Sequence, residues 1–151
     1  MTHKLQPVFD VLLVDDEPAD AHLIKMSFKE NQVPCNLHHV YDGVEAMAFL
    51  QRQGDANQNV PRPDLILLDL NMPRMNGREF LAQIKTSADL SSIPVIVLTT
   101  SDIERDVVSS YRLGANSYIT KPVDIEHFIE IVRQINGYWF SAVRLPAKAE
   151  R

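Results

Sequence analysis

Short runs of consecutive apolar residues recur along the chain, and segments with helical periodicity separate them. The clearest runs are VLLV (11–14), LILL (65–68) and PVIVL (94–98). They are rich in branched residues and do not alternate with polar ones, which is typical of strands buried on both faces of a parallel sheet. Two weaker runs, 35–41 and 117–120, predict two further strands.

The segments between and after these runs predict five helices. The first begins near Pro18, a residue accepted in a first helical turn, and presents apolar side chains at helical spacing up to Phe28. The second follows the turn Asp42-Gly43 and ends near Gln53. Residues 54–63 are rich in Gly, Asn, Gln and Pro and are expected to form a loop.

Capping residues mark the other three helices. Asn76 and Glu79 have the spacing of a capping box ahead of a helix that starts near Gly77. The sequence repeats this spacing at 101 and 104, ahead of a helix through Val107, Val108 and Tyr111, and Asp124 can cap a last helix. Five strands and five helices in strict alternation predict an α/β fold with a doubly wound parallel sheet.

Composition limits the classes of function. A chain of 151 residues with 45% hydrophobic content fits one domain with its own core. The net charge of −5 and the pI near 5.5 argue against a general nucleic-acid or anionic membrane surface. No apolar stretch is long enough to span a bilayer, and the N-terminus lacks the apolar segment of a secretory signal. We therefore expect a cytoplasmic protein, and its single cysteine, Cys35, excludes an internal disulfide.

Three carboxylates follow the predicted strands. Asp15 and Asp16 come directly after the first strand, and Asp69 follows the strand at 65–68. Ligands of open parallel sheets bind outside the carboxyl ends of the strands, so these acids should converge at one edge. Mg²⁺ prefers hard oxygen ligands and takes a few carboxylates, which makes the three side chains its candidate ligands. The backbone carbonyl of Asn71 could complete the shell.

A hydroxyl and an ammonium group lie at two other strand ends. Thr99 follows the strand at 94–98, and Lys121 follows the strand at 117–120. Phosphoryl transfer mainly requires alignment and positive charge around the phosphoryl oxygens, which Mg²⁺ and Lys121 can supply while Thr99 donates a hydrogen bond. Asp69 is then the candidate nucleophile and would form an acyl phosphate. Each feature alone is common in α/β folds, and their joint occurrence carries the prediction.

The chain resembles the receiver domains of response regulators in two-component signalling. The matching segments are VLLVDDEP (11–18), LILLDLNMPRMNG (65–77), IPVIVLTT (93–100) and SYITKPV (117–123). The resemblance implies a flavodoxin-like sheet with strand order 2-1-3-4-5 and a receiver domain over residues 8–137. Residues 1–7 would then be an N-terminal extension, and residues 138–151 an aromatic tail.

The resemblance also assigns roles to the candidate residues. Asp69 is implied to be the phosphorylated residue, and Lys121 is implied to be the phosphate-binding lysine. The implied metal ligands are Asp15, Asp16, Asp69 and the Asn71 carbonyl. Thr99 and Tyr118 correspond to the switch residues, which would remodel the surface of the fourth helix, fifth strand and fifth helix. A sensor histidine kinase is the implied partner. Self-phosphorylation and self-dephosphorylation would be the only chemistry, so the protein is not an enzyme in the usual sense.

Three segments indicate a subgroup within this family: the loop at 54–63, the sequence LTTSD and the tail GYWFSAVRLP (137–146). They are similar to the small response regulators of cyanobacterial phytochromes, and the few residues after Ile135 predict a stand-alone receiver. Tyr138, Trp139 and Phe140 cannot all face one side of a helix, so we expect the tail to cover a partner, such as a second copy of the chain. The alternative is that Trp139 packs on its own domain.

Two other functions share parts of this sequence pattern. A phosphorelay intermediate, which passes its phosphoryl group to another histidine protein, remains an alternative. An aspartyl-phosphate hydrolase usually has a second acid two residues after its nucleophile, where this chain has Asn71. Thr100 departs from the small residue usual beside the switch hydroxyl, which leaves the lifetime of the phosphorylated state open.

Overall fold

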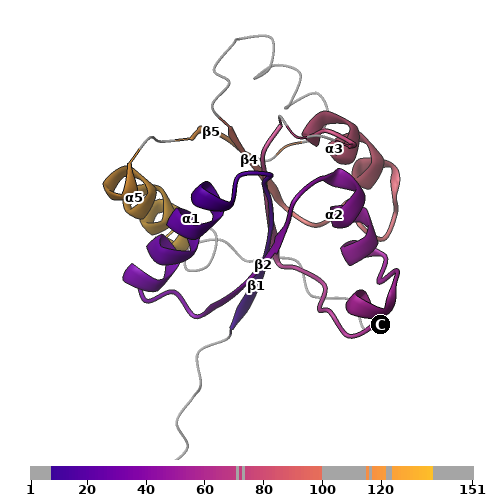
Figure 1. Ribbon diagram of the computed structural model, residues 1–151, viewed down its shortest axis with the longest axis horizontal. Coiled ribbons are helices and arrows are strands. Elements are labelled where there is room, and N and C mark those ends of the chain that lie inside the picture. Colours follow the sequence, from indigo (N-terminus) through magenta and orange to yellow (C-terminus); the bar gives the residue numbers. More distant parts are fainter. Residues whose placement is uncertain are drawn as a thin grey trace, which may run out of the picture.

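Five parallel strands form the centre of the molecule (Figure 1). The computed structural model describes residues 8–70, 72, 74–99, 115, 117–121 and 124–137, and of Thr99 and Tyr118 it describes the backbone. The strands pair in the order β2-β1-β3-β4-β5, and all four pairings are parallel. The predicted α/β class and strand order are therefore confirmed. The strands are β1 (Phe9–Val14), β2 (Cys35–Val40), β3 (Leu65–Leu68), β4 (Val95–Thr99) and β5 (Ser117–Thr120).

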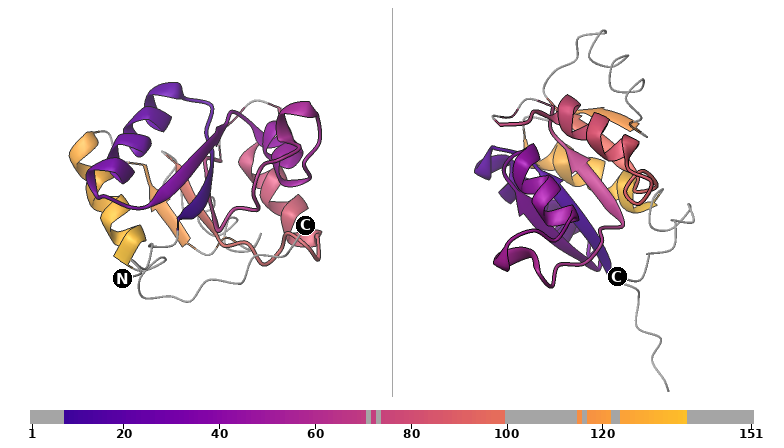
Figure 2. Two further views of the ribbon diagram at one scale, coloured as in Figure 1. Left: turned by 90° about the horizontal axis from the view of Figure 1, so that it is seen from below. Right: turned by 90° about the vertical axis from the view of Figure 1, so that its right-hand side faces the viewer.

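Helices cover both faces of this sheet (Figures 1 and 2). One face carries the first and last helices, which pack against each other, and the other face carries the second and third. These helices are α1 (Pro18–Glu30), α2 (Gly43–Leu50), α3 (Gly77–Thr86) and α5 (Ile125–Ile135). The predicted helix with Val107, Val108 and Tyr111 lies outside the described residues.

The two faces of the sheet bury two apolar clusters. On β1, Leu12 and Val14 point toward α2 and α3, whereas Val11 and Leu13 point toward α1 and α5. All four side chains are almost fully buried, as expected for a strand with helices on both sides. The unalternating apolar runs of the sequence are thus explained by burial on two faces.

The segment after α2 differs from its prediction. The helix ends at Leu50, earlier than predicted, because Arg52 adopts a left-handed conformation with φ of 53°. The Arg52 N–H then bonds to the Phe49 carbonyl and the Gln53 N–H to the Ala48 carbonyl, which closes the C-terminus of the helix. The predicted loop over 54–63 contains a short 3₁₀ turn, Asp55–Asn57. Among the residues that the structure describes, no helix is both long and apolar enough to traverse a lipid bilayer.

Side-chain caps begin three of the helices. The predicted capping box is present at α3, where the Asn76 side chain accepts from the Glu79 N–H and the Glu79 side chain accepts from the Asn76 N–H. At α2 the Asp42 side chain accepts from the Glu45 N–H, and at α5 the Asp124 side chain accepts from the His127 N–H. The capped N-termini lie at the edge of the sheet where the strands end, because each of these helices follows a strand in the chain.

Replacement of Asp42 by alanine should destabilise the fold. The buried Asp42 carboxylate accepts from the Glu45 N–H at 2.9 Å and pairs with Arg74 Nε at 2.8 Å. Loss of an N-cap costs about 0.5–2 kcal/mol, and we expect Asp42→Ala to lie at the upper end, about 2 kcal/mol. Urea unfolding measures the loss. Asp124→Ala, at an exposed cap, is the matched control, and an equal or larger loss in that variant would contradict this account.

Candidate functional site

The ends of β1 and β3 place two carboxylates side by side. The Asp15 N–H bonds to the Val40 carbonyl at 3.1 Å, and the Asp69 N–H bonds to the Val14 carbonyl at 2.9 Å. These bonds extend the sheet one residue beyond each strand, so the backbone at Asp15 and Asp69 is fixed by sheet pairing. The two buried side chains therefore belong to a rigid part of the fold.

Asp15, Asp16 and Asp69 form a compact acidic cluster. One carboxylate oxygen from each residue lies within 4.8 Å of those of the other two. Asp15 and Asp69 are buried and Asp16 is partly exposed, so the cluster opens to solvent on one side. Hard oxygen ligands at this spacing, with room for water, fit a divalent cation such as Mg²⁺ or Mn²⁺.

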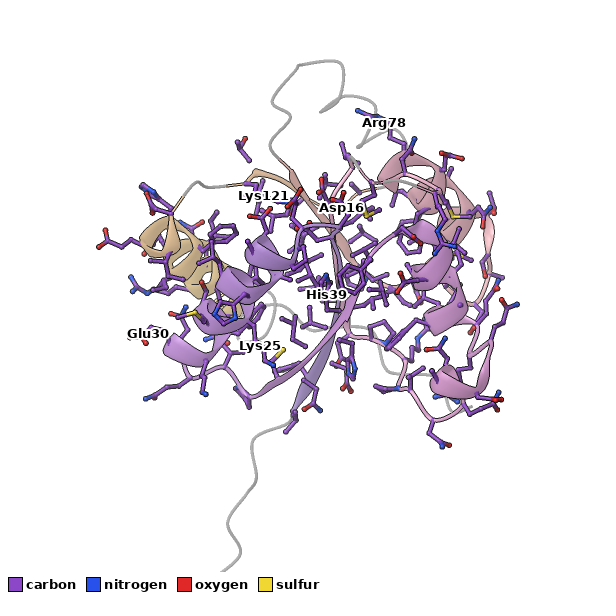
Figure 3. The ribbon with its side chains drawn as sticks, in the orientation of Figure 1. Asp16, Lys25, Glu30, His39, Arg78 and Lys121 are labelled. Atoms are coloured by element: carbon purple, nitrogen blue, oxygen red, sulfur yellow. The ribbon has the colours of Figure 1, made fainter. Side chains whose placement is uncertain are left out.

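Lys121 reaches the same cluster from β5 (Figure 3). Its ammonium Nζ lies 2.8 Å from Asp15 Oδ2 and 3.3 Å from Asp69 Oδ2. The lysine side chain is only 4% exposed, so these contacts form away from bulk water. The order of the strands puts β4 between β3 and β5, and the long lysine side chain spans that distance.

Burial and charge shift the ionisation of this pair. Burial raises the pKa of the Asp15 carboxyl, and its hydrogen bond with Lys121 only partly offsets the effect. Burial by itself lowers the pKa of the Lys121 ammonium, but its contacts with Asp15 and Asp69 outweigh burial and raise it. Lys121 therefore carries its charge at neutral pH, and the acidic cluster still favours additional positive charge.

The loop after Asp69 is held against α2 and α3. A Cβ on Gly77 would lie 2.3 Å from the Asp69 carbonyl oxygen, so only glycine fits at this point of α3. Gly43 donates its N–H to the Met75 carbonyl at 3.0 Å, next to the ion pair between Asp42 and Arg74. Both Arg74 and Met75 have left-handed backbones, with φ of 37° and 50°. Arg74 and Met75 thus contact the start of α2, through the ion pair with Asp42 and the hydrogen bond from Gly43.

For two other predicted site residues, Thr99 and Tyr118, the structure describes the backbone position. Thr99 ends β4 and Tyr118 lies in β5, and the two strands are neighbours in the sheet. Asn71 and Thr100 lie outside the described residues. The structure thus brings together the side chains of Asp15, Asp16, Asp69 and Lys121.

Two residues near the site were not predicted from the sequence. Asp20 in the first turn of α1 has its Oδ2 3.0 Å from Lys121 Nζ. His39 Nε2 lies 2.7 Å from the Asp15 carbonyl oxygen and donates a hydrogen bond to it when that nitrogen is protonated. Of these two residues, only Asp20 could have been suspected from the sequence. It lies four residues after Asp16, in a helix that starts at this edge of the sheet.

Comparisons with known proteins agree on one family. The family model described as the response regulator receiver domain matches residues 11–133. The response regulator Rcp1 of Synechocystis sp. is 46% identical over 147 residues, which cover 97% of this chain and 99% of that protein.

Solved structures support the same assignment. The Mn²⁺-bound form of response regulator Rcp1 has a TM-score of 0.84 and 47% identity, and the match covers 92% of this chain and 99% of that one. The phosphorylated cyanobacterial phytochrome response regulator RcpA has a TM-score of 0.87 and 44% identity, over 93% of this chain and all (100%) of that one. The chain therefore belongs to the response regulator receiver domain family of signalling proteins.

Proposed function

We propose that the protein is a response regulator that accepts a phosphoryl group on Asp69. The observation that carries the proposal is the position of Asp69 within the acidic cluster, with the Lys121 ammonium 3.3 Å from its Oδ2. An Asp69 oxygen attacks phosphorus and forms a new P–O bond, while the bond to the donor breaks and the donor keeps the electron pair. Lys121 is placed to bind the charge on the phosphoryl oxygens.

Asp15, Asp16 and Asp69 are the proposed ligands of Mg²⁺, together with the Asn71 backbone carbonyl. The raised pKa of Asp15 and the spacing of the three carboxylates support a divalent cation at this place. When bound, Mg²⁺ supplies positive charge that offsets the repulsion between the carboxylates and an incoming phosphoryl group. In the chain itself, Lys121 supplies the second positive charge.

The proposed donor is a sensor histidine kinase. Membership of the receiver family implies such a partner, and the similarity to RcpA, a phytochrome response regulator by name, favours a phytochrome-type kinase. A donor of this class would act on a cytoplasmic protein. Homodimerisation through the tail at 138–151 stays a prediction, because the tail lies outside the described residues.

Phosphorylation is proposed to act through Thr99 and Tyr118. Thr99 ends the strand next to β5, where Val97 is the register partner of Tyr118. The hydroxyl of Thr99 would move toward the phosphoryl group, and Tyr118 would follow, which changes the surface around β5 and α5. A shift from 1:99 to 99:1 between two states requires about 5.5 kcal/mol, to which a phosphate contact with Lys121 contributes.

Metal-dependent phosphorylation tests this proposal. We expect incubation with Mg²⁺ and acetyl phosphate to add one phosphoryl group, detected by intact-protein mass spectrometry. EDTA should prevent the addition, because the carboxylate cluster then lacks compensating charge. A phosphorylated histidine kinase serves as the second phosphodonor in the experiment. Absence of the adduct with both donors, over a range of Mg²⁺ concentrations, would refute the proposed function.

A further inference from the structure

The ammonium group of Lys121 has three carboxylate partners, and only two of them belong to the acidic cluster. Its Nζ lies 2.8 Å from Asp15, 3.3 Å from Asp69 and 3.0 Å from Asp20. Asp20 comes from α1 and is 26% exposed, whereas the Lys121 side chain is 4% exposed. The third partner therefore approaches the buried ammonium from the solvent side of the site.

The three contacts use the whole donor capacity of the ammonium group. A protonated lysine has three N–H donors and no acceptor, and each of the three carboxylates can take one. A phosphoryl group on Asp69 also needs an N–H of Lys121. One existing contact must then be given up or shared, which makes the carboxylates competitors of the phosphoryl group.

Asp20 differs from the other two partners in one respect. Asp15 and Asp69 belong to the cluster that fits a divalent cation, so their charges are compensated when the cation binds. Asp20 is not part of that cluster, so the cation does not compensate its negative charge, which continues to attract the Lys121 ammonium. Asp20 is thus the partner that still holds the ammonium when the site is ready for phosphorylation.

We propose that Asp20 is a positioning residue that restrains Lys121 and slows phosphorylation of Asp69, an inference that rests on the proposed function. The negative charge of Asp20 draws the ammonium toward α1 and reduces the positive charge available to the phosphoryl oxygens. In the reaction with acetyl phosphate, Asp69 forms the new P–O bond and acetate leaves with the electron pair of the old one. Asp20 takes no part in these bonds and acts only through Lys121.

The rate of phosphorylation in Asp20→Asn tests this role. Asparagine keeps the shape and the hydrogen-bond acceptor but removes the charge, so Lys121 is less restrained. We expect the rate constant with acetyl phosphate and Mg²⁺ to rise by up to about fivefold, the upper end of the range for an exposed ion pair. Glu17→Gln is the matched control, because Glu17 is an exposed acid at the N-cap of α1 whose side chain makes no cap bond. This control should change the rate little.

Thermal unfolding in EDTA, without metal or phosphodonor, separates the proposal from a structural role. A residue that only stabilised α1 would lower the melting temperature in Asp20→Asn and would not raise the rate. A rate in Asp20→Asn that is unchanged or lower, or an equal rise in Glu17→Gln, would overturn the proposal while leaving Asp69 as the acceptor. If the unmodified protein takes up no phosphoryl group, the proposed function fails and this inference fails with it.

Discussion

Asp69→Asn is expected to abolish phosphorylation of the protein by both acetyl phosphate and a histidine kinase. The amide oxygen of asparagine is a poor nucleophile, and the side chain offers one neutral oxygen in place of a carboxylate within the cluster. Asp15, the other buried carboxylate beside Lys121, is 1% exposed against 6% for Asp69, so Asp69 is the more accessible of the two to a phosphodonor. The loss should therefore be complete within the detection limit of intact-protein mass spectrometry.

The Asp69→Asn variant should still fold, because asparagine keeps the volume of aspartate and relieves repulsion within the cluster. Its melting temperature in EDTA checks this. Asp55→Asn is the control for the change in net charge, because Asp55 is exposed in the 3₁₀ turn after α2. The Asp55→Asn variant should be phosphorylated to the same extent as the unmodified protein. A stoichiometric adduct in Asp69→Asn would mean that another residue is the acceptor.

Gly77→Ala is expected to destabilise the protein, because it adds a side chain where α3 closely approaches the backbone of Asp69. The new Cβ would lie 2.3 Å from the Asp69 carbonyl oxygen and 2.6 Å from the Leu70 Cα, and both are backbone atoms that cannot rotate away. Overpacking of this kind costs about 1–3 kcal/mol, and the clash with fixed backbone puts the expected loss near the upper end. The higher helix propensity of alanine recovers about 1 kcal/mol at most. We expect a net loss of about 2 kcal/mol in urea unfolding.

The same change should impair phosphorylation, because the backbone that must move carries Asp69. Gly137→Ala is the matched control, since a Cβ there would lie within 4 Å of no heavy atom from another part of the described residues. This control should unfold and become phosphorylated like the unmodified protein. Gly77→Ala with unchanged stability and an unchanged rate would show that the start of α3 can shift away from Asp69 at no cost.

Sequence patterns alone predict the strands, most of the described helices and the order of the chemical groups along the chain. An unalternating apolar run such as 65–68 has few folding options besides a strand with helices on both faces. The capping pair Asn76 and Glu79 is a local signal, and the structure has the predicted box. Since parallel strands end at one edge, the meeting of Asp15, Asp16 and Asp69 also followed from the sequence.

The contacts between charged groups and the tight packing of the site depend on how distant segments meet in the folded chain. The contact between Lys121 and Asp20 joins residues 101 positions apart, and it depends on how α1 lies beside the end of β5. The hydrogen bond from His39 to Asp15 requires the register of β1 and β2, which no local pattern encodes. The need for glycine at position 77 arises from the approach of α3 to Asp69. Local preferences fix elements and their ends, whereas contacts between distant side chains depend on packing that only the folded chain defines.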